Sequence, residues 1–486
     1  MNFKILFKKI FSNKIFIYLG SRYVTYGLQF FVSLIIASRL GPYYMGIYGF
    51  ISLLLNYVGQ FNLGIPHSLN VLLVHHKGED EAYNQYVVNS FIIYGGLSII
   101  VVAIYATLKL FNIELNDKYP IDNYLLLIVL TAVLTYYNYV MATVLRFKNK
   151  VNQLSIVQSL NVALNLAVVF FFIEENLVMA LVVCQFVSYI VSIIITYKTR
   201  ILPPLRSIKM QRGVLKELLH KGIYLFLYNS CFFFILLSVR TVISVNYSVE
   251  EFGLFTFSFT IAHAVLLLME SLMMIIFPKV IYLLSSKDYA QIKATISKIR
   301  VAFISSSHFA IYLALSLFPL LLLFLPKYAD SVTALNLTAL AILMNTNSYG
   351  YSSFLIAQNK ENISARISVL SLLLNIALAL ILTNIFHVRF SYVIIATLIT
   401  YLFFSFMTVS EGNKLVGDKS IIESIVGFFP IRLLVPYVIA LVLSILEQEY
   451  LIWIPLVVYV VINYKDIVVL IQMARKLANN PNIADI

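Results

Sequence analysis

Charged residues are scarce in this sequence of 486 residues. Lys, Arg, Asp and Glu number 57 in all (35 basic and 22 acidic), or 12% of the chain, against about 25% in an ordinary soluble domain. A water-facing surface takes about 25–35% charged residues, so the composition excludes a disordered chain and argues strongly against a soluble globular protein. Residues of the hydrophobic set make up 61%. We therefore expect lipid to be the solvent for most of the chain.

Cysteine and the common catalytic motifs are also lacking. The two cysteines, Cys184 and Cys231, both fall inside apolar runs, so neither a disulfide framework nor a metal site is predicted. The sequence has no Walker phosphate loop and no cluster of metal ligands. We therefore expect no enzyme and no cofactor.

Long apolar runs bounded by charge clusters predict an all-α integral membrane protein. A helix needs about 20 residues to cross about 30 Å of hydrocarbon, and continuous runs argue against a β-barrel, whose strands alternate. About fourteen spans are expected, at 15–38, 45–66, 89–110, 123–145, 153–173, 177–197, 222–245, 254–277, 301–325, 333–356, 367–386, 390–410, 430–446 and 450–463. The last two are short and contain Pro436 and Pro455, so twelve or thirteen spans stay open as alternatives.

The basic residues are distributed unevenly between the two sides. With the N-terminus inside, 27 of the 35 Lys and Arg fall on inner segments and five on outer loops. This bias predicts that both termini lie in the cytoplasm. It also explains the net charge of +13 without any nucleic acid, because anionic membrane lipids attract a basic inner surface.

The longest basic inner loop, 198–221, contains seven Lys and Arg and divides the chain into two halves. Shifting the first half by 207 residues aligns Gly46 with Gly253 and Asn138 with Asn345. Six spans in each half make the repeats parallel, an arrangement typical of transporters with a cavity between two lobes. The expected parts are a six-helix lobe (1–197), a basic cytoplasmic linker (198–221), a pseudo-symmetric six-helix lobe (222–410), and two extra helices with a tail (411–486).

A short motif joins the first two spans. Residues 40–48 read Leu-Gly-Pro-Tyr-Tyr-Met-Gly-Ile-Tyr, and residues 248–255 echo them with Ser248 in place of the first Gly. Gly41 and Pro42 break one helix, and Gly46 allows close packing of the next. With the two six-span halves, the basic middle loop and the two extra spans, this pattern resembles the polysaccharide flippase branch of the multidrug/oligosaccharidyl-lipid/polysaccharide exporter superfamily.

The resemblance covers almost the whole chain and implies a function. It implies that an undecaprenyl-diphosphate-linked oligosaccharide moves from the inner to the outer leaflet of a bacterial inner membrane by alternating access. The product would serve surface polysaccharide (O-antigen) biosynthesis. The implied partners are the lipid-linked oligosaccharide, membrane lipids and other polysaccharide assembly proteins.

Few ionisable groups remain inside the predicted spans. An ionisable group at bilayer depth costs about 2.5–3.5 kcal/mol, so it usually faces a protein interior or a water-filled cavity. Hydroxyls and amides can bind sugars, and Arg can bind a diphosphate. The polar stripes of the first, second and eighth spans, the arginine of the seventh span and the repeat-related asparagines make the candidate substrate-binding residues Arg22, Arg240, Glu270, His263, Asn56, Gln29, Gln60, Asn138 and Asn345.

Alternatives remain open for the charged residues and for the function. Arg22 and Arg240 lie near span ends and could reach the headgroups, and Glu270 could pair with an Arg. Two Arg against one Glu inside the membrane favour an anionic cargo over the small cationic drugs of a multidrug-type exporter. A polysaccharide polymerase or glycosyltransferase would need a larger outer loop than 111–122, and the polar stripes argue against a purely structural protein.

Overall fold

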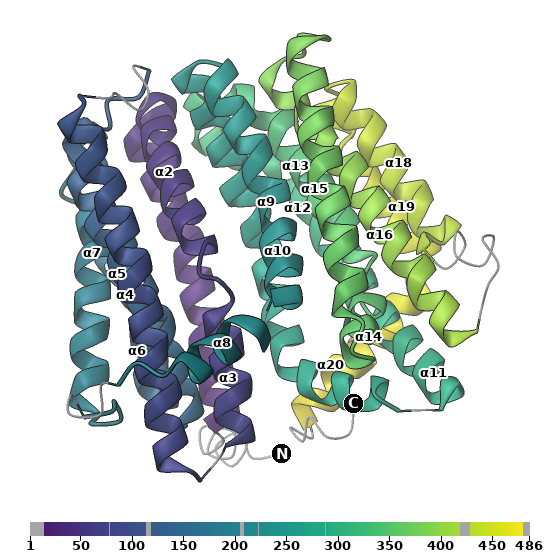
Figure 1. Cartoon of the computed structure of the whole chain (residues 1–486). Coiled ribbons are helices and arrows are strands. Elements are labelled where there is room, and N and C mark those ends of the chain that lie inside the picture. The colour runs from purple at the N-terminus through teal and green to yellow at the C-terminus, as the bar shows by residue number, and fades with distance from the viewer. Residues whose placement is uncertain are drawn as a thin grey trace. The chain divides into compact units, whose positions relative to one another are not determined.

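The chain folds almost entirely into α-helices (Figure 1). The structure is a computed structural model that describes the backbone of residues 14–76, 78–112, 118–204, 209–221, 223–286, 288–417 and 428–479. Side chains are described over the same ranges except 14–22, 221, 224–225, 266–279 and 473–479. No strand occurs in these ranges, which confirms the predicted all-α class. Contacts divide the chain into unit 1, Met1–Ser230, and unit 2, Cys231–Ile486.

Unit 1 begins with a long helix that contains a break. At Gly41 the backbone is non-helical (φ 69°, ψ 172°), and Pro42 follows, so the predicted break in the motif is confirmed. The second predicted span ends at Gln60, because the Asn62 side chain accepts from the Gly64 N–H (2.9 Å) and closes the turn before the next helix. The helices of unit 1 are α2 (Lys14–Gln60), α3 (Ile65–His75), α4 (Asp80–Leu110), α5 (Asp122–Phe147), α6 (Val151–Val168), α7 (Glu174–Lys198) and α8 (Arg212–Lys221).

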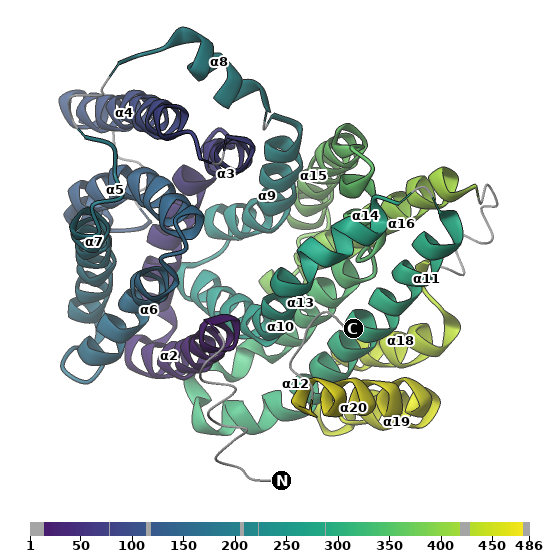
Figure 2. The ribbon, with the colours of Figure 1, turned by 90° about the horizontal axis from the view of Figure 1, so that it is seen from below.

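The segment predicted as a basic linker contains the helix α8, which packs on α3 and α4 (Figure 2). Leu218 of α8 is fully buried in a cluster of side chains from α3, α4 and α5. Two tyrosines of α4 also hold this segment: Tyr83 Oη donates to the carbonyl of Ile201 and Tyr86 Oη to Glu217, each at 2.7 Å. Within unit 1 the segment is therefore packed against the helix bundle.

Unit 2 is built around α13, which packs against α10, α12, α16 and α18. Every residue of α13 except Asn345 is buried, as expected of a helix that is apolar on all sides. The helices of unit 2 are α9 (Ile223–Asn246, which begins in unit 1), α10 (Val249–Leu284), α11 (Tyr289–Ile299), α12 (Ser305–Phe324), α13 (Val332–Thr346), α14 (Tyr351–Ala357), α15 (Glu361–Asn384), α16 (Ile395–Val416), α18 (Ile431–Ile445), α19 (Ile454–Ile462) and α20 (Tyr464–Asn479).

Several expected spans of unit 2 are interrupted. A π-helical turn, Arg300–Ile304, joins α11 to α12. Gly350 adopts φ 89° between α13 and α14, a conformation that glycine accepts without steric cost. The last expected span ends in a bend of 75° between Ile462 and Tyr464. At 1.5 Å per residue, the nine residues of α19 reach only about 14 Å, less than the hydrocarbon thickness.

The echo of the first motif at residues 248–255 has a different local structure. Ser248 caps α10 in a reciprocal capping box: its Oγ accepts from the Glu251 N–H (3.1 Å), and its own N–H donates to Glu251 Oε2 (2.8 Å). A Ser/Glu pair at this spacing satisfies two orphan N–H groups of the helix start. In the second motif Ser248 therefore caps the start of α10, whereas in the first motif Gly41 interrupts α2.

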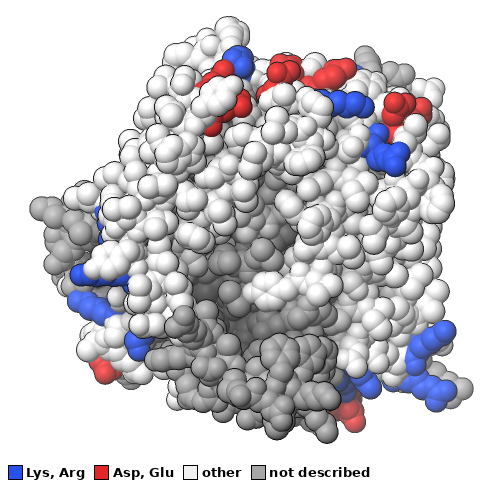
Figure 3. Space-filling model, turned by 180° about the vertical axis from the view of Figure 1, so that it is seen from behind, with Lys and Arg blue, Asp and Glu red and all other residues white. Residues whose placement is uncertain are grey.

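The described helices are those of a multi-pass membrane protein of about fourteen helices. Eight are long and apolar enough to cross a membrane, and a ninth if the bent pair Glu449–Ile462 and Tyr464–Gln472 counts as one span. The first of the eight, Tyr23–His75, is 53 residues long and long enough for two crossings. Among the described residues on the face drawn in Figure 3, charged side chains lie near the upper and lower margins, and the side chains between them are uncharged.

Candidate functional site

A polar cavity of about 90 Å³ lies inside unit 1, between α2, α5 and α7. Seven of its nine lining residues carry a hydroxyl or an amide. The lining residues are Ser52, Leu55, Asn56, Gly59, Gln60, Thr135, Tyr139, Gln185 and Tyr189. The predicted polar stripe of the second span, with Asn56 and Gln60, thus faces a polar space built jointly with two other helices.

The cavity lies near the middle of α5 and α7 and beside the C-terminal end of α2, which stops at Gln60. Thr135 is 13 residues from Asp122 at one end of α5 and 12 residues from Phe147 at the other. At 1.5 Å per residue these separations are about 18–20 Å, so the cavity is far from both ends of an apolar helix. Polar groups at such depth are costly unless a protein cavity or a ligand satisfies them.

Close packing positions the polar groups. A Cβ at Gly59 would lie 2.9 Å from Tyr139 Oη, so only glycine allows this hydroxyl to approach the backbone of α2 so closely. On α7, Gln185 Nε2 donates to Tyr189 Oη (3.4 Å). The Thr135 hydroxyl donates to the carbonyl of Thr131 (2.8 Å) and so presents an acceptor lone pair. The result is a wall of neutral donors and acceptors.

This lining is suited to ligands that are rich in hydroxyl groups. Amide side chains both donate and accept, and hydroxyls do the same with rotatable geometry. The described lining contains no Asp, Glu, Lys, Arg or His. A small cation would find no carboxylate in it, whereas a single hydroxyl group of a sugar would find neutral donors and acceptors.

Asn138 lies next in sequence to a residue of this cavity and makes hydrogen bonds to two helices. Its Nδ2 donates to the carbonyls of Leu134 (2.9 Å) and Tyr189 (3.4 Å). It therefore links α5 to α7 at the turn that presents Tyr189. Its neighbour Tyr139 lines the cavity instead.

A second polar cluster lies inside unit 2, where α9 and α10 are adjacent. Arg240 is only 3% exposed, and its guanidinium lies 5.0 Å from the ring centre of Phe259 and 6.0 Å from that of Phe252. The His263 ring stacks on Phe259 at 5.7 Å with an interplanar angle of 5°. The structure thus brings together two predicted residues, Arg240 and His263, which both contact the ring of Phe259.

Two other predicted residues, Gln29 and Asn345, belong to neither cluster. Gln29 is on an exposed face of α2, and Asn345 is half-buried in the last turn of α13. The side chains of Arg22 and Glu270 lie outside the described residues. Substrate binding stays a prediction for these four residues, as it does for Arg240, His263, Asn56, Gln60 and Asn138.

Five polar residues that line the unit 1 cavity are absent from the predicted substrate-binding residues: Ser52, Thr135, Tyr139, Gln185 and Tyr189. Gln185 and Tyr189 are four residues apart, so they share one face of α7. Gln185 lies near the centre of an otherwise apolar span, and this isolated amide is the signal that would have identified the face.

Comparisons with known proteins reveal relatives in fold. No protein-family model and no curated protein matches the chain. Among solved structures, the chain is similar to an inward-facing multidrug resistance transporter of the MATE family of the MOP superfamily (TM-score 0.65, 14% identity, 81% of this chain and 94% of that chain). It is similar to the lipid II flippase MurJ in an inward closed conformation (TM-score 0.66, 13% identity, 94% and 99%).

A MOP-superfamily transporter from Pyrococcus furiosus is also similar, with a TM-score of 0.51 and 17% identity over 82% of this chain and 94% of that chain. At such identities the likeness concerns the fold and not the cargo. The chain therefore has the fold of the MOP-superfamily membrane transporters and of MurJ.

Proposed function

We propose that the chain is a flippase that moves a lipid-linked oligosaccharide between the leaflets of a membrane, with an undecaprenyl-diphosphate carrier as the expected lipid. The glycan would pass along the polar side chains, while the lipid tail stays in the bilayer. Transport would require that the headgroup binds two states of the protein with different affinities. The proposed location, the bacterial inner membrane with both termini in the cytoplasm, rests on the distribution of Lys and Arg in the sequence.

The observation that carries this proposal is the neutral polar cavity at mid-helix depth in unit 1. Its amides and hydroxyls, among them Asn56, Gln60 and Gln185, are the groups that recognise sugar hydroxyls. Polar side chains at the middle of α5 and α7 cost more to bury than apolar ones unless a partner or a ligand satisfies them. A hydrophilic cargo that passes the cavity would satisfy these polar side chains.

Two further features support an anionic, lipid-linked cargo. Arg240 is buried against aromatic rings in unit 2, and Arg is the residue that binds diphosphates with two parallel hydrogen bonds. The fold likeness to a lipid II flippase extends over 94% of this chain, against 81% for the multidrug transporter.

Export of small cationic molecules is the second candidate, because the likeness to a multidrug resistance transporter is equally strong in TM-score. Such a cargo calls for a carboxylate within the membrane. The candidate for that role is Glu270, whose side chain lies outside the described residues. The cavity of unit 1 has no carboxylate in its described lining, which makes this candidate the weaker one.

A transport assay in proteoliposomes separates the two candidates. Vesicles would hold the purified full chain and an undecaprenyl-diphosphate-linked oligosaccharide, and a lectin added outside would measure how fast the glycan appears on the outer leaflet. We expect Gln185→Leu to slow this appearance by about tenfold, because one unsatisfied polar contact costs about 1–3 kcal/mol.

The matched control is Asn176→Leu, which removes an amide from the exposed first turn of the same helix. This variant should transport at the unmodified rate. Equal rates for the two variants would contradict the role of the cavity. Failure of the unmodified chain to move the glycan, together with movement of ethidium under the same conditions, would replace the flippase by the cation exporter.

A further inference from the structure

A second pocket, of about 300 Å³, lies in unit 2 among α11, α14, α16 and α18. It is near the end of the unit where the basic loops of the sequence predict the inner side of the membrane. Three cationic residues line it: Lys293 from α11, Arg300 from the π-helical turn, and Arg432 from α18. Its described lining contains no Asp or Glu. Arg432 pairs with Asp466 beside the pocket, so the excess of positive charge comes from Lys293 and Arg300, and its potential favours an anion.

The guanidinium of Arg300 is held in place from several directions. Its Nη1 donates to the carbonyl of Asn347 (2.7 Å) and its Nη2 to the carbonyl of Phe428 (3.0 Å). Its Cζ also lies 5.5 Å from the ring centre of Tyr351. Since π-helical turns occur frequently at functional sites, the widened turn that begins at Arg300 is consistent with a binding role.

Tyr351 is in turn seated on a glycine. A Cβ at Gly412 of α16 would overlap the Tyr351 ring, so the ring lies directly on the backbone of that helix. Glycine at position 412 therefore leaves space for the Tyr351 ring, and this ring in turn packs against the guanidinium of Arg300.

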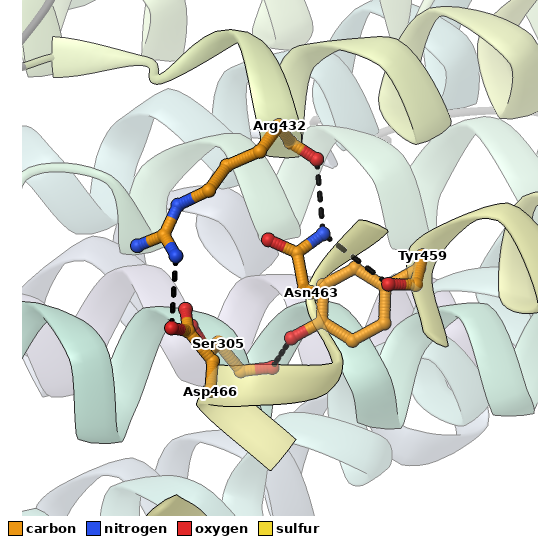
Figure 4. A network of polar contacts seen from close by, with 5 residues as sticks. All are labelled: Ser305, Arg432, Tyr459, Asn463 and Asp466. Carbon is orange, nitrogen blue, oxygen red and sulfur yellow. Dashed lines mark hydrogen bonds and ion pairs between the residues drawn. The ribbon is translucent and has the colours of Figure 1, made fainter. Parts of the chain in front are cut away.

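Arg432 is oriented by the network drawn in Figure 4. Its Nη1 contacts Asp466 Oδ1 at 2.8 Å, and Asp466 Oδ2 accepts from the Ser305 hydroxyl at 2.8 Å. The Asn463 amide donates to the Arg432 carbonyl at 3.0 Å, and Tyr459 Oη donates to the Ser305 carbonyl at 2.6 Å. The Arg432 side chain is still 42% exposed, so part of its guanidinium can reach a ligand.

We propose that this pocket binds a phosphate group, carried by a membrane lipid headgroup or by a soluble phosphate compound. Guanidinium and ammonium groups are the preferred partners of phosphate oxygens, and the pocket has two of the former and one of the latter. The hydroxyls of Ser297 and Tyr351, which also line the pocket, add donors. A volume of about 300 Å³ is at the lower limit of small-molecule sites. It suits a phosphoglycerol or diphosphate group better than an oligosaccharide.

The site goes beyond the proposed function. It consists of residues of unit 2 alone, and none of them lines the polar cavity of unit 1. Phosphate binding here depends neither on the glycan nor on transport, so the two proposals fail or succeed separately.

Native mass spectrometry of the purified full chain in detergent tests the proposal. The probes are phosphatidylglycerol as the lipid source of phosphate and inorganic pyrophosphate as the soluble source. We expect Lys293→Gln to weaken binding of the probe by about fivefold, since one cation near an anionic headgroup contributes about a factor of five. Lys293→Arg should restore the affinity.

The matched control is Lys298→Gln, since Lys298 is exposed on the same helix and outside the pocket. Weakening confined to Lys293→Gln supports the site. In that case, binding of phosphatidylglycerol identifies a lipid headgroup, and binding of pyrophosphate alone identifies a soluble phosphate. Equal affinities of the two Gln variants for both probes, or no binding of either probe by the unmodified chain, would overturn the proposal.

Discussion

The substitution Asp466→Asn tests how firmly the C-terminal helices are attached to the rest of unit 2. Asp466 is the first-turn carboxylate of α20, and its side chain is 9% exposed. It accepts one hydrogen bond from Arg432 of α18 and one from Ser305 of α12, both at 2.8 Å. The substitution keeps the shape of the side chain and removes its charge, so it isolates the electrostatic part of this contact.

The expected loss follows from these two bonds. A hydrogen bond to a charged group contributes about 1.5–3 kcal/mol and a neutral one about 0.5–1.5 kcal/mol, so each bond weakens by about 1–1.5 kcal/mol. The contribution of Arg432 is reduced by about half for solvent screening, because 42% of its side chain is exposed. The free energy of unfolding of unit 2 should fall by about 1.5–2 kcal/mol.

Thermal unfolding of the purified chain in one detergent measures this loss. Unit 2 spans 256 residues (231 to 486), and at about 2.1 cal/mol/K per residue a loss of this size lowers the Tm by about 3–4 °C. The only tryptophan, Trp453, directly precedes α19. Its fluorescence therefore reports on the helix pair that the substitution loosens.

The control is an exposed ion pair of the same unit. Glu411→Gln removes the contact between Glu411 and Lys414 (2.6 Å), whose side chains are 26% and 58% exposed. A surface pair of this kind contributes about 0.2–1 kcal/mol, so the Tm should change by at most about 2 °C. If Asp466→Asn lowers the Tm no more than Glu411→Gln does, the reasoning from burial is refuted.

Two substitutions of glycine give further predictions. Gly59→Leu places a side chain where even a Cβ would lie 2.9 Å from Tyr139 Oη. The new side chain should fill the 90 Å³ cavity, which has room for about three waters. Glycan transport in the proteoliposome assay should slow at least tenfold. Gly96→Leu, at a position with open space around it, should leave the rate unchanged, and equal slowing by both would contradict the role of the cavity. Gly412→Ala should displace the Tyr351 ring and lower the free energy of unfolding by about 1–3 kcal/mol through overpacking. A melt of Gly412→Ala that matches that of Gly96→Ala would show that the ring has room to move.

The sequence predicts local features of this protein well. Hydropathy alone indicates a multi-pass membrane protein, because about 20 apolar residues in a row have few other stable environments. The break at Gly41 and the stripe of Asn56 and Gln60 are confirmed because they depend on φ/ψ preferences and on the helical period. Each of these features is decided within a few residues of chain.

The internal breaks of unit 2 were harder to predict. The π-helical turn at Arg300 and the positive φ at Gly350 interrupt runs whose hydropathy is continuous. Hydropathy averages over a window and does not register a single widened turn or a single left-handed residue. The capping box of Ser248 with Glu251 is an exception, since its spacing can be read from the sequence.

What the sequence by itself determined is the solvent of this protein, its helical class and the polar face of the second span, because composition and periodicity are properties of contiguous residues. Only the tertiary structure decided which polar faces meet: Tyr139 and Gln185 with the stripe of α2, and Lys293, Arg300 and Arg432 around one pocket. Those groupings depend on how far each helix is rotated about its axis when it packs. Rotation is set by the shapes of side chains on neighbouring helices, which come from distant parts of the chain.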